Sequence, residues 1–166
     1  MGKCRLFGKK GLFLSLNESD LCRICAVVVG QDVERSAQIL KESMELVEKT
    51  KNPDTLMSRL DLVESRLDAL IEYETRGIPT LQPVPSELKA ALTADRGRIL
   101  SRVAAELTQA ALAKAALSSS SKRARTAVEK AQRTICDMGG RYGHPAELED
   151  SLDKLARYLD RAAEGG

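Results

Sequence analysis

The residues of this chain that are best suited to chemistry are the two cysteines of Cys22-Arg23-Ile24-Cys25. On a helix, residues three apart lie on nearly the same face, and a helix N-terminus favours the thiolate form that binds metals. Two thiolates supply half of a tetrahedral zinc site. The candidates for the remaining ligands are Cys4 and either Cys136 or His144, and a dimer that brings two Cys-x-x-Cys pairs together would also supply four sulfurs. The sequence suggests no cofactor other than zinc.

Two other interpretations of Cys22 and Cys25 stay open. A redox pair would also use the helix N-terminus, but thioredoxin-type pairs belong to a βαβ unit, and none is visible in the sequence. Plain packing is the third interpretation, because a free Cys behaves as a small buried hydrophobic residue and Cys22 falls on an apolar helical stripe. A single Cys-x-x-Cys without a second pair does not decide among the three.

An acidic row follows one face of the second predicted helix at steps of three and four. It consists of Asp61, Glu64, Asp68 and Glu72. Carboxylates can hold two iron ions in helical bundles, but those sites use Glu-x-x-His repeats, and the only His of the chain lies elsewhere. We therefore interpret the row as a solvated or ion-paired face.

A basic cluster lies in the helix predicted at 122–138. It consists of Lys122, Arg123, Arg125, Lys130 and Arg133. Clusters of Lys and Arg contact phosphates in proteins that bind nucleic acids. No aromatic residue interleaves with this cluster, and the helix carries no base-reading motif. We therefore prefer the interpretation that the cluster faces the acidic row.

Helices must position these residues, because Ala, Leu, Glu, Lys and Arg dominate the composition. Residues 18–77 contain two series of apolar residues at steps of three and four, which predicts two helices. Between them, Asn52 suits the N-cap position and Pro53 the first helical position. So short a turn predicts a long antiparallel, coiled-coil-like hairpin. The predicted inner stripe of its first helix is Cys22, Ala26, Val29, Val33, Ala37, Leu40, Met44 and Val47.

Pro, Gly and Ser residues divide the rest of the chain. Residues 1–17 form a basic N-terminal segment with a short extended piece at 12–16, and Asn17 is the predicted N-cap of the first helix. A Pro-rich connector at 78–85 follows Gly77, and three further helices occupy 86–166. We expect breaks at 118–121 and at Gly139-Gly140. The last helix is expected to begin with His144 as its cap, Pro145 in its first position and Glu147 in a box-like pattern. The prediction is an elongated all-α bundle, one continuous structural unit with the hairpin.

The composition constrains where the protein works. Its 166 residues are 43% hydrophobic and carry a formal net charge of +2, which commits the protein neither to nucleic acid nor to membranes. The longest apolar run is far too short to span a bilayer, and the basic start lacks the apolar core of a signal peptide. We therefore expect no membrane partner, a cytoplasmic location, and cysteines that are reduced or bind a metal.

The segment from Lys49 to Arg59, whose sequence is KTKNPDTLMSR, resembles a turn found in uncharacterised helical proteins of bacteria and their phages. In that group an aromatic residue often follows the Ser-Arg pair, whereas this chain has Leu60. The opening FGKK at 7–10 and the cysteines at 22 and 25 are also similar to members of the group. The resemblance implies an all-helical fold and a bacterial or phage origin, and it implies no chemistry.

No acid, base and nucleophile converge in the sequence, and every predicted helix carries a narrow apolar seam suited to pairing. We therefore expect a non-enzymatic interaction or scaffold protein that forms a homo-oligomer, most simply a dimer, or binds another protein. No small-molecule substrate is indicated. The alternative is a nucleic-acid-associated regulatory protein that uses the basic start and the basic cluster.

Overall fold

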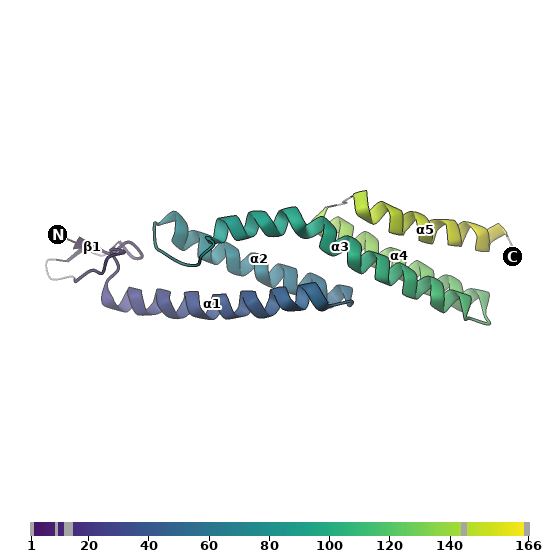
Figure 1. Cartoon of the computed structure of the whole chain (residues 1–166), viewed down its shortest axis with the longest axis horizontal. Coiled ribbons are helices and arrows are strands. Elements are labelled where there is room, and N and C mark those ends of the chain that lie inside the picture. Colours follow the sequence, from purple (N-terminus) through teal and green to yellow (C-terminus); the bar gives the residue numbers. More distant parts are fainter. Residues whose placement is uncertain (1, 9, 12–14, 144–145, 165–166) are drawn as a thin grey trace. The chain divides into compact units, whose positions relative to one another are not determined.

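The computed structural model describes residues 2–8, 10–11, 15–143 and 146–164, and the predicted all-α class is confirmed (Figure 1). Two short strands, β1 (Gly2–Lys3) and β2 (Lys10–Gly11), pair antiparallel ahead of the helices. No helix within the described ranges is long and apolar enough to cross a membrane. The helices are α1 (Arg23–Lys49), α2 (Pro53–Thr75), α3 (Pro85–Ala116), α4 (Ser121–Tyr142) and α5 (Ala146–Glu164).

The chain forms two compact units. The first contains Met1–Leu46 and Ser58–Leu92, and therefore holds most of α1 and α2 and the start of α3. The second contains Val47–Met57 and Thr93–Gly166, and therefore holds the turn between α1 and α2, most of α3, and all of α4 and α5.

The turn between α1 and α2 forms as predicted. α1 ends at Lys49, and the Asn52 side chain caps α2. Its Oδ1 accepts hydrogen bonds from the N–H groups of Asp54 and Thr55 at 2.9 and 3.2 Å. Pro53 occupies the first position of α2, where a missing N–H leaves no intrahelical bond unmade.

The start of α1 differs from the prediction, because the helix begins only at Arg23. Asn17 does not cap it. The Asn17 Oδ1 instead accepts hydrogen bonds from the N–H groups of Ser19 and Leu21 at 3.1 and 2.8 Å. Asp20 has a φ of 57°, which a right-handed helix cannot accommodate. The short polar side chain of Asn17 therefore stabilises a tight turn in competition with the helix.

In the first unit, α1 and α2 contribute an apolar core. Tyr73 of α2 also donates a hydrogen bond from its hydroxyl to the Asp32 Oδ2 of α1 at 3.0 Å. The buried face of α1 includes Ser36 and Ser43, each 1% exposed, which the apolar pattern did not predict. Neither hydroxyl has a hydrogen-bond partner within the described part of the chain. The buried apolar side chains of the two helices in this unit are Cys25, Val29, Leu40, Leu60, Val63, Leu67 and Leu70.

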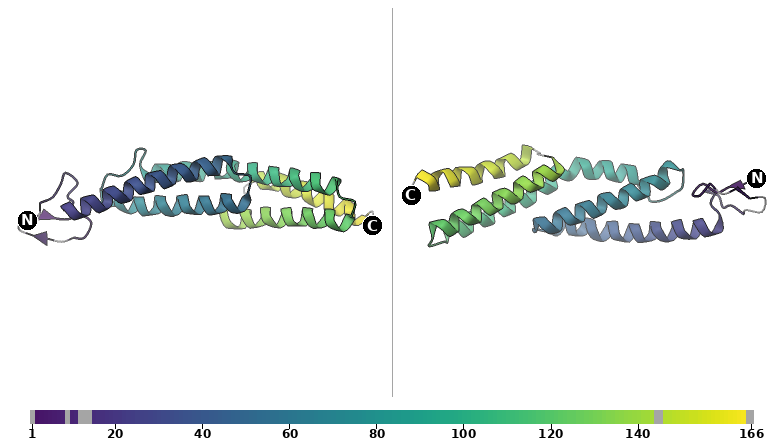
Figure 2. Two further views of the ribbon diagram at one scale, coloured as in Figure 1. Left: turned by 90° about the horizontal axis from the view of Figure 1, so that it is seen from below. Right: turned by 180° about the vertical axis from the view of Figure 1, so that it is seen from behind.

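In the second unit, α5 packs along α4 (Figure 2). Ser120 caps α4, since its Oγ accepts a hydrogen bond from the Arg123 N–H at 3.5 Å. Arg102 of α3 extends to the C-terminal end of α1, where it donates hydrogen bonds to the carbonyl oxygens of Val47 and Thr50 at 2.6 and 3.0 Å. The buried side chains of α3, α4 and α5 include Ile99, Leu100, Val103, Val128, Ile135, Met138, Leu148 and Leu155.

The predicted stop of α4 at Gly139-Gly140 is wrong, since the helix continues to Tyr142. Met138 is fully buried, and the Tyr142 hydroxyl donates a hydrogen bond to the Met57 carbonyl at 2.9 Å. This packing outweighs the propensity cost of about 1 kcal/mol for each helical Gly.

A connector joins α2 to α3. Gly77 has a φ of 67°, as predicted for a glycine that ends a helix. Its N–H bonds the Glu74 carbonyl at 2.8 Å, and the N–H of Ile78 bonds the Tyr73 carbonyl at 3.0 Å, so both carbonyls are satisfied. Ser86 lies in the first turn of α3, which begins at Pro85. Its hydroxyl donates a hydrogen bond to Glu74.

Some predictions fall outside the described residues. These are the extended piece over 12–14, the cap at His144 and the proline at Pro145, together with the role of the Glu147 side chain. α5 begins at Ala146, directly after Pro145.

Candidate metal centre

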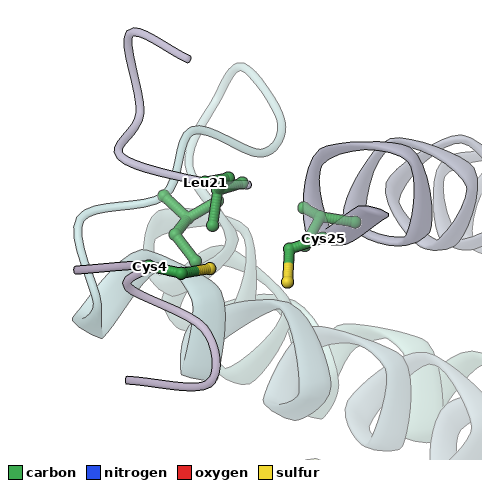
Figure 3. Packing of buried hydrophobic residues seen from close by; sticks show 5 residues of the cluster. Cys4, Leu21 and Cys25 are labelled. Carbon is green, nitrogen blue, oxygen red and sulfur yellow. The ribbon is translucent and has the colours of Figure 1, made fainter. Parts of the chain in front are cut away.

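Three cysteines from separate segments meet in the first unit. Cys4 lies in the turn between β1 and β2, Cys22 lies directly before α1, and Cys25 lies in the first turn of α1. Their Sγ atoms all lie within 4.8 Å of one another, and those of Cys22 and Cys25 are 3.2 Å apart. Figure 3 shows the sulfurs of Cys4 and Cys25 directed toward a common space.

The β1–β2 hairpin places Cys4. Lys3 and Lys10 are register partners across the two strands, and the chain turns between them. The Gly8 N–H donates to the Cys4 carbonyl at 2.8 Å, and Gly8 has a φ of 67°, which a residue with a side chain rarely adopts. The Arg5 N–H also donates to the Asp20 carbonyl at 3.0 Å, so the turn is held against the segment that precedes α1.

The late start of α1 places the other two cysteines. The turn closed by Asn17 reverses the chain, and Leu16 forms an antiparallel bridge with Cys22. Cys22 therefore enters the site from an extended segment, and its own N–H remains outside the helix ladder. Cys25 enters from the helix itself.

Backbone donors stabilise the thiolate form of Cys4. The Cys22 N–H donates to the Cys4 Sγ at an N–S distance of 3.5 Å. This contact, with the N–H groups of Phe7 and Leu6 and the thiol of Cys25, outweighs burial and lowers the pKa of Cys4 to about 6. The cluster therefore holds a thiolate in neutral solution, which is the form that a metal requires.

Cys25 behaves in the opposite way. Its hydrogen bond with the Cys22 thiol, its burial and the nearby Cys4 sulfur raise the pKa of Cys25 to about 12. The fold therefore shifts the pKa values of Cys4 and Cys25 in opposite directions. A bound cation would remove this opposition, because its charge compensates several thiolates at once.

Apolar side chains surround the three sulfurs. Cys4 and Cys25 are each 1% exposed and pack with the buried side chains of Leu21, Val29 and Ile78 (Figure 3). Cys22 is half-buried. The cluster therefore satisfies the packing interpretation of Cys25 and also provides the dry, shaped surroundings of a metal site.

Two arginines hold the N-terminal turn to the end of α2. Arg5 donates from Nη1 to the Gly77 carbonyl at 2.9 Å, and Arg76 donates from Nη1 to the Leu6 carbonyl at 2.9 Å. Arg5 also forms a salt bridge with Asp20 at 3.1 Å. The turn that carries Cys4 is thus attached to the segment before α1 and to the segment directly after α2.

Among the candidate ligands that the structure describes, it brings together Cys4, Cys22 and Cys25. Within the described residues, the cluster contains these three thiols without a carboxylate or an imidazole. Cys136 is exposed on α4, which belongs to the second unit, and His144 lies outside the described residues. Nothing in the spacing of the sequence distinguished Cys4 from Cys136, because the contact of Cys4 depends on the hairpin turn and on the turn at Asn17.

The basic cluster of α4 and the acidic row of α2 have the following partners within the described residues. All five members of the basic cluster on α4 are exposed, and Arg125 pairs with Glu129 of its own helix at 2.9 Å. In the acidic row of α2, Asp68 forms an ion pair with Lys89 of α3.

Comparison of the chain with family models, with curated proteins and with solved structures gives no match. The resemblance of the turn segment at 49–59 stays a prediction. The chemistry of the site therefore rests on its own geometry: three cysteines that lie close together and could hold a metal ion.

Proposed function

We propose that the protein is a non-enzymatic helical interaction protein that pairs with a second copy of itself. The observation that carries this proposal is a row of exposed apolar side chains at the start of α1. Ile24 is 75% exposed, Val27 54% and Val28 47%. Contiguous apolar side chains on a protein surface mark sites of association.

A second copy is the partner that suits this surface best. The patch itself carries no charge, and the whole chain has a net charge of only +2, so two copies repel each other weakly. A two-fold pair is the commonest symmetric assembly, and it lays one patch against the same patch of the other copy.

We further propose that the three thiols hold a zinc ion. Thiolate ligands select soft or borderline metals such as zinc over magnesium and calcium. The donors aimed at the Cys4 sulfur fit this role, because N–H groups that contact a ligand sulfur orient it and stabilise its charge. The ion would fasten the β1–β2 hairpin, which is too small to be stable alone, to the start of α1.

The pairing is tested by light scattering on the purified full chain at high micromolar concentration. We expect a dimeric mass for the wild type and a monomeric mass for the double variant Ile24→Gln/Val28→Gln. Leu117→Gln is the matched control, because Leu117 is 88% exposed on another part of the chain and should leave the dimer intact. A monomeric wild type would contradict the proposal.

A second candidate function is favoured by the exposure of the basic cluster. Within the described part of the chain, no acidic side chain pairs with Lys122, Arg123, Lys130 or Arg133. Four cations on one helix remain available to phosphates. We infer that a nucleic-acid-associated regulatory role is the alternative to self-association as the main function.

A further inference from the structure

We propose that the metal in this site keeps one coordination position for a thiolate supplied from outside the chain. The inference rests on the proposed zinc site and goes further by assigning the missing ligand. Tetrahedral zinc takes four ligands, and a site with three protein ligands leaves the fourth position open to an external donor. The described residues bring three donors together, all of them thiols.

By sequence spacing, Phe7 corresponds to the position of a fourth protein ligand. It follows Cys4 at the spacing that separates Cys22 from Cys25. The Phe7 backbone N–H is one of the groups that lower the pKa of Cys4, which places it near the site. The Phe7 side chain is nevertheless 66% exposed, so it contributes little to the core. The chain therefore contributes one Cys-x-x-Cys motif and one Cys-x-x-Phe motif to the same site. The side chain of Phe7, in the place of the fourth Cys, is exposed to solvent.

The charges around the turn favour an anionic ligand over a neutral one. Lys3 and Lys10 are exposed register partners on β1 and β2, next to the turn that carries Cys4. Like charges directly opposite each other in a strand pair are destabilising unless an anion compensates them. A zinc ion with three thiolates has a charge of −1, and a fourth thiolate would raise it to −2 beside these two cations. An anionic ligand of the same soft type as the three protein sulfurs is a thiolate, from a small-molecule thiol or from a cysteine of a second copy.

The test uses the full chain with cobalt(II), a spectroscopic substitute for zinc, in buffer free of thiols. We expect one cobalt ion per wild-type chain and a visible spectrum that changes saturably when 2-mercaptoethanol is added. Phe7→Cys should show the four-sulfur spectrum at once and should not respond to the added thiol. Phe7→Ser, which removes the ring without adding a thiol, should respond like the wild type. Phe7→Cys should also bind zinc at least tenfold more tightly than Phe7→Ser.

The two sources of the thiolate are separated by dilution. If a second copy supplies it, the response to 2-mercaptoethanol should be absent at high protein concentration and appear at low concentration. A response at every concentration supports a small-molecule thiol.

Two results would overturn the inference in different ways. Wild-type protein that binds cobalt one to one but never responds to thiol has a closed site, so the open position is refuted while the metal site stands. If the wild type does not respond to 2-mercaptoethanol but the Cys136→Ser variant does, the fourth ligand in the wild type is Cys136. Wild-type protein that binds neither cobalt nor zinc refutes the metal site itself.

Discussion

Cys4 is the residue on which the candidate site depends, because it is the one thiol whose charged form is supported by backbone donors. In the unfolded chain its pKa returns to the ordinary value near 9, whereas the fold lowers it to about 6. A lowered pKa contributes stability that is fully present above the unfolded value and is lost as pH falls through the folded value. The stabilising effect of Cys4 in the metal-free protein should therefore disappear between about pH 9 and pH 6.

We predict that the difference in unfolding free energy between the metal-free wild type and the Cys4→Ser variant shrinks steadily as the pH is lowered from about 9 to about 6. Ultraviolet absorbance of the thiolate should report the same ionisation as a single step near pH 6 that Cys4→Ser abolishes. Cys136→Ser is the control, because Cys136 is exposed and lies outside the cluster. A step that survives Cys4→Ser would assign the acidic thiol to another residue.

At this scale the sequence indicated two of the three thiols, Cys22 and Cys25, and named Cys4 only as one of several candidates for a further ligand. The spacing of Cys22 and Cys25 is local, so the sequence pointed to this pair, although Cys22 lies directly before α1 and not within it. The contribution of Cys4 depends on Gly8 and Asp20, both with positive φ, and on a turn closed by the Asn17 side chain. Such turns arise from competition between side-chain and helix hydrogen bonds, which residue periodicity does not reveal.

Among the elements, the C-terminal end of α1 is capped by a residue from α3. The last carbonyls of a helix have no partner within it, and Arg102 satisfies those of Val47 and Thr50 with one guanidinium. Arg98, one turn earlier on α3, forms exposed ion pairs with Glu48 and Asp95 instead. The two arginines therefore provide a matched comparison between a cap and surface ion pairs.

We predict that Arg102→Ala lowers the unfolding free energy by about 2–3 kcal/mol, because it leaves carbonyls near a buried residue without donors. Arg98→Ala should lower it by less than about 1 kcal/mol, as is usual for exposed ion pairs. Arg102→Lys keeps the positive charge but lacks the planar guanidinium, so its loss of unfolding free energy should lie between those of Arg98→Ala and Arg102→Ala. Chemical denaturation of the three variants measures these values, and equal losses for Arg98→Ala and Arg102→Ala would contradict the capping role.

Helix ends divide into those that the sequence predicts and those that it does not. Asn52 and Gly77 act locally, so their cap and stop were predicted correctly. The continuation of α4 through Gly139-Gly140 depends on the burial of Met138 and on the bond from Tyr142 to Met57, which are distant in sequence. Tertiary contacts of this kind override local propensity.

For the whole molecule, the net charge of +2 conceals an uneven distribution of charge. The basic cluster of α4 is the part of that distribution most suited to phosphates, whereas α5 carries cations that are paired within the helix. Lys154 forms an ion pair with Asp150 and Arg157 with Asp153.

If the nucleic-acid role holds, the wild type should retard DNA or RNA in gels at low salt. Arg123→Ala/Arg125→Ala/Lys130→Ala should weaken this binding at least tenfold and reduce the slope of log K against log salt by about one per lost phosphate contact. Lys154→Ala/Arg157→Ala/Arg161→Ala removes the same formal charge from α5 and should have little effect. Absence of any retardation at low salt would eliminate this role.

The paired arginines at the N-terminal turn have a consequence for how the proposed metal site would gain and lose an ion. Arg5 and Arg76 each donate to a carbonyl of the other's segment, and neither bond involves the sulfurs. If the proposed metal binds, the turn that carries Cys4 has one attachment that depends on the metal and another that does not. Emptying the site would then release only the first, so the ligands would stay in register and the ion could return without a search through unfolded conformations. Occupancy would then behave as a reversible local signal, read at the start of α1, that leaves the helical framework intact.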